Sequence, residues 1–301
     1  MRYLETVIQV TGLEKSYGKF RALDGLDLEV AQGEVMGFLG PNGSGKSTTI
    51  RILLGLLKAD AGVVNIMGQD PWRNVVDLHR RLAYVPGDVS LWPTLTGGEA
   101  IDLLAKLRGG QDLQRRADLI EKFDFDPTKR GRQYSKGNRQ KVAIIAALCA
   151  NVDLLILDEP TSGLDPLMEA VFQAEIRHEK AQGRTILLSS HILSEAEALA
   201  DRVSIIRAGK IVEVGTIDQL RSHTPASLQV TLNTAPSSRA EKVRLDELLK
   251  NPSWQGATLS AGVDRHAVGA VLSALMPYGI TNLTVSEPSL EDLFLSQYEV
   301  S

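Results

Sequence analysis

The stretch that decides the fold is GPNGSGKST, from Gly40 to Thr48, which fits the pattern G-x-x-x-x-G-K-[ST]. It follows the apolar, strand-like EVMGFL and precedes the helix-like TTIRILLGLL, which is the context that a phosphate-binding loop needs. In such a loop the glycines let backbone N–H groups turn toward phosphate oxygens, Lys46 reaches the β and γ phosphates, and the Ser47 hydroxyl can bind Mg²⁺. The alternative, a glycine-rich turn with a solvated lysine, does not explain the length and placement of the motif. The predicted nucleotide-binding residues are Gly40, Pro41, Asn42, Gly43, Ser44, Gly45, Lys46, Ser47 and Thr48.

A second motif, LLILDEP, ends an apolar strand with two neighbouring carboxylates, Asp158 and Glu159. Neighbouring side chains of a strand point to opposite faces, but the chain turns where the strand ends, so both carboxylates can reach the nucleotide crevice. We expect Asp158 to hold Mg²⁺ through its water shell and Glu159 to activate the attacking water as general base. The alternative is a solvated acidic strand end, which the upstream loop makes the weaker reading. Together the two motifs predict a P-loop ATPase.

Strand-like and helix-like segments alternate from residue 1 to about 220, which is typical of an α/β fold with a largely parallel sheet. The strand-like segments are VIQVTGL, VMGFLG, LAYVPG, DLLILDE, TILLSS and RVSIIRAG. Between residues 72 and 150 the pattern is mostly helical, so we expect a helical subdomain inserted into the α/β body.

A break at RSHTPAS, residues 221 to 227, separates this part from a different pattern. Residues 225 to 301 predict a small α+β accessory domain. Its expected strands are SLQVTLN, ATLSAGV and ITNLTVSE, and its expected helices are AEKVRLDELLKN, AVGAVLSALMPYG and a terminal SLEDLFLSQY.

Composition limits the class of protein. With 301 residues, 43% hydrophobic and 23% charged, the chain is globular, and a net charge of -4 gives no electrostatic reason for nucleic acid as the main partner. The longest apolar run, VAIIAALCA, is far shorter than the roughly 20 residues of a membrane helix. The opening MRYLETVIQV reads as a strand and not as a cleaved signal, so we expect a cytosolic protein. The single cysteine, Cys149, is expected to be a buried hydrophobic residue, and five scattered histidines give little support for a zinc site.

Over residues 5 to 220 the motifs and their order resemble those of the ATP-binding subunits of ABC transporters. SYGKF places Tyr17 where that family stacks an aromatic ring on adenine. SGLD, which ends in Asp165, is similar to the family's D-loop, and LLSSH ends in His191, at the position of its γ-phosphate switch histidine. Taken singly, an aromatic residue in a turn or a histidine before a helix is more often structural. The resemblance implies an ABC cassette that uses ATP and Mg²⁺.

The stretch YSKGNRQK, Tyr134 to Lys141, stands where that family has its signature, commonly LSGGQ. Read locally, it is a helix start with Ser135 as N-cap, and a helix N-terminus favours anions. In the family this loop binds the γ-phosphate of the ATP held by the opposite subunit, which would be the role of Ser135 and Gly137. One copy of each motif therefore implies a dimer, either a homodimer or a heterodimer with a paralogue.

This sequence departs from the family pattern at two places. The signature has Tyr134, Lys136 and Asn138 in place of the common Leu, Gly and Gln. YVPGD has Gly87 where the family usually has a glutamine that touches Mg²⁺ and the attacking water, and Asp88 is the nearest residue that would substitute for it. Slow or differently gated hydrolysis is one consequence to test.

The C-terminal VSEPSLEDLFLSQY resembles the ending of one branch, the ATP-binding subunits of ABC-2-type drug and antibiotic exporters of the daunorubicin-resistance kind. Its helix would place Leu290, Leu293, Phe294 and Tyr298 on one face, for which simple packing is the alternative explanation. The resemblance implies a cytoplasmic motor, peripheral on the inner face of the cell membrane, bound to a separate ABC-2-type permease through the surface from Gly87 to Trp92.

Two other readings stay open at this point. A soluble ABC ATPase acting on ribosomes or DNA would usually fuse two cassettes or insert a long coiled coil, and the sequence has neither. A regulator or resistance factor with degenerate catalysis is suggested by Gly87.

Overall fold

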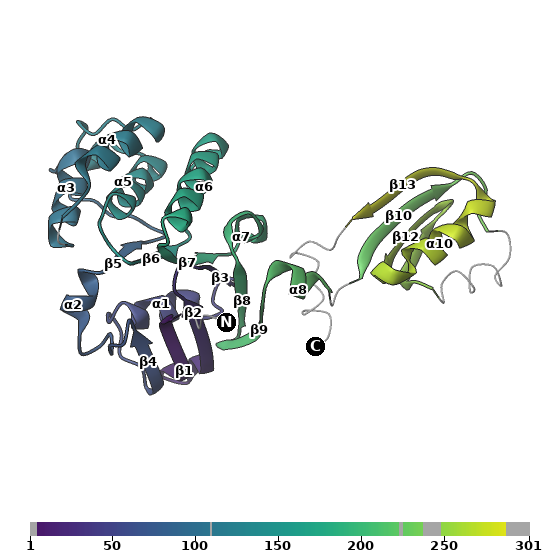
Figure 1. The fold of residues 1–301 in the computed structure, drawn as a ribbon, viewed down its shortest axis with the longest axis horizontal. Helices are drawn as coiled ribbons and strands as arrows, with labels where there is room; N and C mark the ends of the chain where they lie inside the picture. Colours follow the sequence, from purple (N-terminus) through teal and green to yellow (C-terminus); the bar gives the residue numbers. More distant parts are fainter. Residues whose placement is uncertain (1–4, 109, 223–224, 237–247, 287–301) are drawn as a thin grey trace. The chain divides into compact units, whose positions relative to one another are not determined.

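The computed structural model describes residues 5–108, 110–222, 225–236 and 248–286 (Figure 1). The chain forms two compact units that divide between Val214 and Gly215. The elements of the first unit are β1 (Thr6–Tyr17), β2 (Phe20–Ala31), β3 (Val35–Leu39), α1 (Lys46–Leu53), β4 (Ala61–Ile66), α2 (Val75–His79), β5 (Leu82–Val85), α3 (Gly97–Leu107), α4 (Leu113–Lys122), α5 (Lys136–Leu148), β6 (Leu154–Asp158), α6 (Pro166–Ala181), β7 (Thr185–Ser190), α7 (Leu193–Leu199), β8 (Arg202–Arg207) and β9 (Lys210–Gly215).

A six-stranded sheet with the order β5-β6-β7-β3-β8-β9 forms the centre of the first unit, and its first five strands are parallel. Successive side chains of a strand point to opposite faces, so each strand serves two cores. On β6, Leu155 and Leu157 pack with α5 and α6, whereas Leu154 and Ile156 pack with β1, β2 and α1. Figure 1 shows α3 to α6 on one side of this sheet and β1, β2 and β4 on the other. The predicted α/β class with a largely parallel sheet is confirmed.

The first expected strand was assigned to the wrong sheet. VIQVTGL lies in β1, which pairs antiparallel with β2 and β4 in a separate three-stranded sheet of order β2-β1-β4. A two-residue loop, with Gly18 at φ 60°, joins β1 to β2, and so short a loop can only connect antiparallel neighbours. The prediction overlooked both β2 and β4.

The interval from residue 72 to 150 contains more than helices, because β5 lies inside it and pairs parallel with β6. Helices α3, α4 and α5 follow this strand. Helix α5 begins as expected, with Ser135 as its N-cap, and the Ser135 side chain accepts the backbone N–H of Asn138 at 3.3 Å. Tyr134 is buried, its ring tilted against Phe125 at 5.2 Å between centroids. Tyr134, which stands where the signature commonly has leucine, therefore packs in the core.

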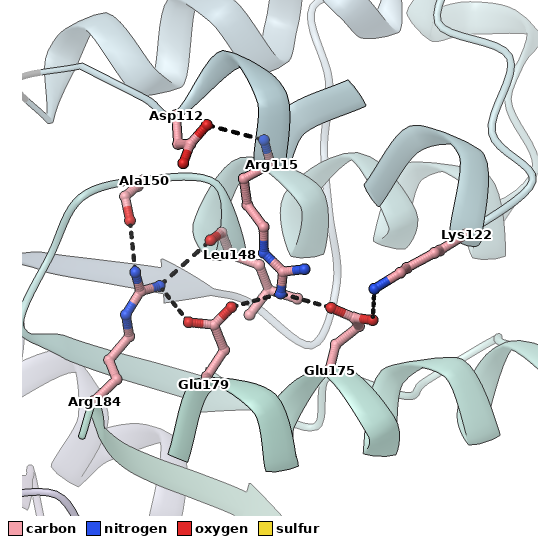
Figure 2. Close-up of polar contacts among 8 residues, drawn as sticks. All are labelled: Asp112, Arg115, Lys122, Leu148, Ala150, Glu175, Glu179 and Arg184. Carbon is pink, nitrogen blue, oxygen red and sulfur yellow. Dashed lines mark hydrogen bonds and ion pairs between the residues drawn. The ribbon is translucent and has the colours of Figure 1, made fainter. Parts of the chain in front are cut away.

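Buried ion pairs connect α4 to α6 (Figure 2). Arg115 contacts Glu175 at 2.6 Å and Glu179 at 2.7 Å, and both carboxylates are almost fully buried. Lys122 contacts Glu175 at 2.7 Å, and Arg184 contacts Glu179 at 3.0 Å. Arg184 also donates to the carbonyl oxygens at the end of α5, those of Leu148 and Ala150. Two carboxylates of α6 thus connect this helix to α4 and, through Arg184, to the end of α5.

We expect Arg115→Ala to lower the free energy of unfolding by about 3 kcal/mol, because removing one partner of a buried ion pair leaves an undercompensated buried charge. The value lies at the lower end of the known range because Lys122 and Arg184 remain. Urea denaturation of the full chain measures the loss. The matched control is Arg81→Ala, whose exposed pair with Asp153 contributes about 0–1 kcal/mol. Equal losses in the two variants would contradict a structural role for the buried cluster.

The same cluster predicts a pH dependence. Burial raises the pKa of Glu175, and its bonds to Lys122 and Arg115 lower it by more, so the net shift is downward from 4.5. A carboxylate with a lowered pKa stabilises the fold above its unfolded pKa and loses that contribution as the pH falls through the folded value. When the pH is lowered below 4.5, the free energy of unfolding of the wild type should therefore fall by more than that of Arg115→Ala.

The second unit is an antiparallel sheet with the order β11-β12-β10-β13. Its elements are α8 (Ile217–Ser222), β10 (Ala226–Leu232), β11 (Lys250–Gln255), β12 (Thr258–Val263), α10 (Val268–Leu275) and β13 (Ile280–Ser286). Val230, Leu259 and Leu275 belong to a separate hydrophobic core. The expected strands and the helix AVGAVLSALMPYG are present, and β11 was not foreseen. The helix AEKVRLDELLKN, for the most part, and the terminal helix lie outside the described residues.

Two further expectations concern single features. Cys149 is buried, and burial raises the pKa of its thiol to about 11, as befits a packed hydrophobic residue. Within the described ranges, none of the helices has the length and apolar character needed to cross a bilayer.

Candidate functional site

The predicted phosphate-binding loop runs between β3 and α1 and has the backbone that its glycines allow. Gly43 has φ 80° and Gly45 has φ 119°, values that L side chains rarely adopt. A Cβ on Gly45 would lie 2.9 Å from the carbonyl oxygen of Ala22, so β2 packs directly against the loop. The loop delivers the chain into the N-terminus of α1, whose free N–H groups favour an anion.

Lys46 opens α1 and points back into the loop. It is 5% exposed, and its Nζ donates to the carbonyl oxygens of Gly40 at 2.5 Å and Pro41 at 3.2 Å. Burial lowers the pKa of Lys46, and the charges of Glu159 and Asp158 oppose that shift. The ammonium thus stands within the loop, beside the predicted metal ligand Asp158 and the predicted base Glu159.

The residues of the loop fit a phosphate group. Ser44 Oγ is buried and has no hydrogen-bond partner among the described residues, and a Cβ on Gly43 would meet nothing within 4 Å. Such an unsatisfied buried hydroxyl beside an open backbone position is what a bound oxyanion would complete.

Asp158 and Glu159 lie where β6 ends. The Asp158 carboxylate is nearly buried and accepts a hydrogen bond from Ser189 Oγ at 2.9 Å. Burial raises its pKa, whereas hydrogen bonds from Ser189 and from the Ser47 hydroxyl partly offset this. A hydroxyl and a carboxylate side by side are hard oxygen donors of the kind that Mg²⁺ binds. Ser189 was not foreseen, although its place at the end of the strand-like TILLSS was visible in the sequence.

Glu159 has a left-handed backbone, with φ 49°, which is uncommon for a residue other than glycine. Its N–H donates to the carbonyl oxygen of Ser189 at 2.9 Å, so the turn is held by β7. Its Oε1 lies 3.2 Å from His191 Nδ1 and 3.8 Å from Lys46 Nζ. The structure therefore brings the predicted base and the predicted switch histidine into contact, 32 positions apart in the chain.

The signature residues contact a different part of the site. A Cβ on Gly137 would lie 2.3 Å from the carbonyl oxygen of Gly163, so glycine is required there. Lys136 Nζ donates to Ser162 Oγ at 2.8 Å. Asp165 caps α6 by accepting the N–H of Met168 at 3.0 Å. Among the described contacts, the signature thus touches the loop after Glu159 and not the phosphate-binding loop.

Tyr17 lies at the β1–β2 turn, opposite Phe20, and is 46% exposed. The ammonium of Lys15 stands 6.0 Å from the centroid of its ring. The β2 strand reaches Gly45 through Ala22 and Leu23, which are five and six residues after Tyr17. The aromatic ring is therefore available to solvent on the hairpin that packs against the phosphate-binding loop.

Gly87 lies against the end of β6, where a Cβ would stand 3.1 Å from the carbonyl oxygen of Asp158. Two residues of α5 hold this loop from the other side, since Gln140 donates to the carbonyl of Pro86 at 3.0 Å and Arg139 to that of Val89 at 3.1 Å. Arg139 and Gln140 thus hold the loop in which Gly87 stands in place of the family's usual glutamine. The sequence did not lead us to predict this role.

Comparisons with known proteins agree with this geometry. A family model described as "ABC transporter" matches residues 23–162. A daunorubicin resistance ATP-binding protein of Streptomyces coeruleorubidus is 38% identical, covering 97% of this chain and 95% of that one. A bacitracin transport ATP-binding protein of Bacillus licheniformis is 33% identical, covering 97% of each chain.

A solved structure of the ATP-binding subunit of an ABC transporter superimposes with a TM-score of 0.67 and 32% identity, covering 72% of this chain and 92% of that one. The relatives match along nearly the full chain, and the solved structure matches the α/β fold that holds Lys46, Asp158 and Glu159. The chain therefore belongs to the ABC transporter family, as one of its ATP-binding subunits.

Proposed function

We propose that this chain hydrolyses ATP to drive export of a drug, an antibiotic or another hydrophobic compound through a separate membrane permease. The observation that carries the proposal is the convergence of Lys46, Asp158, Glu159 and His191 around one phosphate-binding loop. The printed names of the relatives, which concern daunorubicin resistance and bacitracin transport, support the class of cargo.

In the proposed reaction, the loop from Gly40 to Thr48 binds the ATP phosphates and Lys46 neutralises the β and γ oxygens. Ser47 and Asp158 are the residues that would hold Mg²⁺, which supplies further neutralisation of the charge that develops on the transferred phosphoryl group. Glu159 accepts the proton of the attacking water, and His191 contacts the carboxylate of this base.

The remaining predicted residues act in binding and dimerisation. Tyr17 would stack on adenine, and Asp165 would serve in the D-loop. Ser135 and Gly137 would close over the ATP of a second subunit, since the described contacts of the signature lie away from this chain's own phosphate-binding loop. The α5 N-terminus provides the N–H groups for that phosphate. We propose a dimer, with itself or with a paralogue, on this ground.

An apolar groove supports the proposed contact with an ABC-2-type permease. The groove has a volume of about 490 Å³ and reaches Tyr84 on β5, three residues before Gly87. Its apolar lining comes from the segment after α1, from α2 and from α3, and it includes Leu56, Val76 and Leu107, which are 62%, 66% and 66% exposed. Exposed apolar residues that gather in one groove mark an interaction surface. We therefore propose that the permease contacts this groove as well as the surface from Gly87 to Trp92. Through that contact the protein would lie at the inner face of the membrane.

The test is a pull-down of the tagged full chain from detergent-solubilised membranes of the native host, with Mg-ATP and the Glu159→Gln change to retain bound nucleotide. Mass spectrometry should identify a polytopic permease. Adding Val76→Glu should abolish its recovery, because a charge in the groove cannot be buried without a partner. Leu113→Glu, an equally exposed site on α4, is the matched control and should not. Ribosomes, or the chain alone despite bound ATP, would contradict the transport role.

The second unit is proposed as the accessory domain of residues 225–301, following a cassette of residues 1–220. Its own hydrophobic core and separate antiparallel sheet support independent packing. Regulation or support of the dimer is the role that the family resemblance suggests.

A further inference from the structure

A buried carboxylate, Glu195, lies beneath the loop that carries His191. Glu195 is 5% exposed on α7, and its Oε2 accepts a hydrogen bond from Ser190 Oγ at 2.6 Å, in a fully buried contact. Ser190 immediately precedes His191, and its Oγ also accepts the backbone N–H of Ile192 at 2.9 Å. The residues on both sides of the histidine are thus held through one side chain.

The same carboxylate reaches the loop that follows Glu159. Burial, the largest influence, raises the pKa of Glu195, and hydrogen bonding to Ser190 and then Thr161 lowers it. The hydroxyl of Thr161 lies near the carboxylate of Glu195. Among the described residues, however, no group makes a hydrogen bond of good geometry with Oε1. Thr161 is itself buried, two residues after Glu159. Glu195 therefore lies between the loop that carries His191 and the loop that follows Glu159.

A buried carboxylate costs free energy unless its surroundings compensate for it. Among the described residues, the other two buried glutamates, Glu175 and Glu179, have arginine or lysine partners at 3.0 Å or less. The hydrogen bond of Glu195 that the described contacts contain comes instead from the hydroxyl of Ser190, in the loop that carries His191. Glu195 is therefore tied to the loop that carries His191.

We propose that Glu195 is a positioning residue for ATP hydrolysis, which sets the imidazole of His191 against the carboxylate of Glu159 by holding Ser190. The inference rests on the proposed ATPase function. His191 is half exposed, and its 3.2 Å contact with Glu159 depends on where its backbone lies. Ser190 sets that backbone from the buried side. Glu195 touches neither nucleotide nor water in this account, so its effect passes through His191.

The test is a double-mutant cycle on the purified full chain, with Mg-dependent ATP hydrolysis as readout. Glu195→Ala should lower kcat by about 10- to 100-fold, the effect of a small misplacement of reacting groups, with the KM for ATP unchanged. Glu195→Gln, which keeps an acceptor for Ser190, should recover most of the rate. In a His191→Ala background, Glu195→Ala should cause little further loss, because its effect passes through the histidine. Additive losses would overturn the proposal.

Thermal unfolding and binding of a fluorescent ATP analogue monitor the fold of each variant. If Glu195→Ala does not fold, Ser190→Ala removes the same hydrogen bond from the other side and should show the same dependence on His191. The matched control is Glu179→Gln, another buried glutamate, whose effect on turnover should add to that of His191→Ala. A wild type without Mg-dependent hydrolysis would overturn the proposed function as well, whereas an active wild type with additive variants would overturn only the role of Glu195.

Discussion

The Glu159→Gln variant is expected to lose about 10²- to 10⁴-fold in kcat for ATP while it still binds ATP, because this is the usual contribution of a positioned general base. Glutamine has nearly the same shape as glutamate, so the left-handed turn and the hydrogen bond from Glu159 N–H to Ser189 are preserved. What is lost is the negative charge that, in the proposed reaction, accepts the proton of the attacking water. The 3.2 Å contact with His191 places this charge in the site, beside Lys46.

Release of phosphate in single-turnover and steady-state assays measures this loss, and a fluorescent ATP analogue measures binding. Glu121→Gln, an exposed glutamate on α4, is the matched control and should leave turnover unchanged. Appreciable hydrolysis by Glu159→Gln would contradict the assignment of Glu159 as the general base. Absent hydrolysis in the wild type would favour the regulator with degenerate catalysis, for which Gly87 is the motivation.

The Lys46→Ala variant is expected to bind ATP about 10- to 100-fold more weakly, since a hydrogen bond to a charged group contributes about 1.5–3 kcal/mol and 1.4 kcal/mol is a factor of ten. Lys46 is the buried cation of the loop, and its Nζ also holds the carbonyl oxygens of Gly40 and Pro41. Its removal therefore takes away both the proposed phosphate ligand and a contact that shapes the loop. Here the deficit lies in binding, whereas in Glu159→Gln it lies in turnover.

Equilibrium titration with the fluorescent ATP analogue measures the dissociation constant of Lys46→Ala. Lys46→Arg should also bind weakly, because the enclosed site that holds an ammonium does not fit the planar fork of a guanidinium. Lys58→Ala removes an exposed lysine shortly after α1 and is the control expected to keep wild-type affinity. Wild-type affinity in Lys46→Ala would contradict the placement of the phosphates in this loop.

Gly87 shows how the structure changes the meaning of a departure from the family pattern. In the sequence, Gly87 is simply a glycine at the position where the family usually has a glutamine. In the structure, its Cα lies so close to the end of β6 that a Cβ would stand 3.1 Å from the carbonyl of Asp158, while Gln140 holds the loop at Pro86. A glutamine placed here would require its neighbours to shift by a few tenths of an ångström. The close approach of two backbones is therefore part of how this loop is built.

What could be predicted from the sequence alone was local. The phosphate-binding loop, the strand ending in Asp158 and Glu159, and Ser135 as a helix cap are each encoded within about ten residues, because turn geometry, capping and period depend on neighbours in the chain. The two-residue loop after Tyr17 was an equally local sign of a hairpin, and it was overlooked.

What only the tertiary structure decided was which distant residues meet. Parallel pairing of β6 with β7 sets Asp158 opposite Ser189, and that register carries His191 to Glu159. The burial of Glu195 beneath Ser190 follows from the same arrangement. No local preference specifies these contacts, because strands that pair in parallel are joined by a long crossover, and their register follows from packing both faces of the sheet at once.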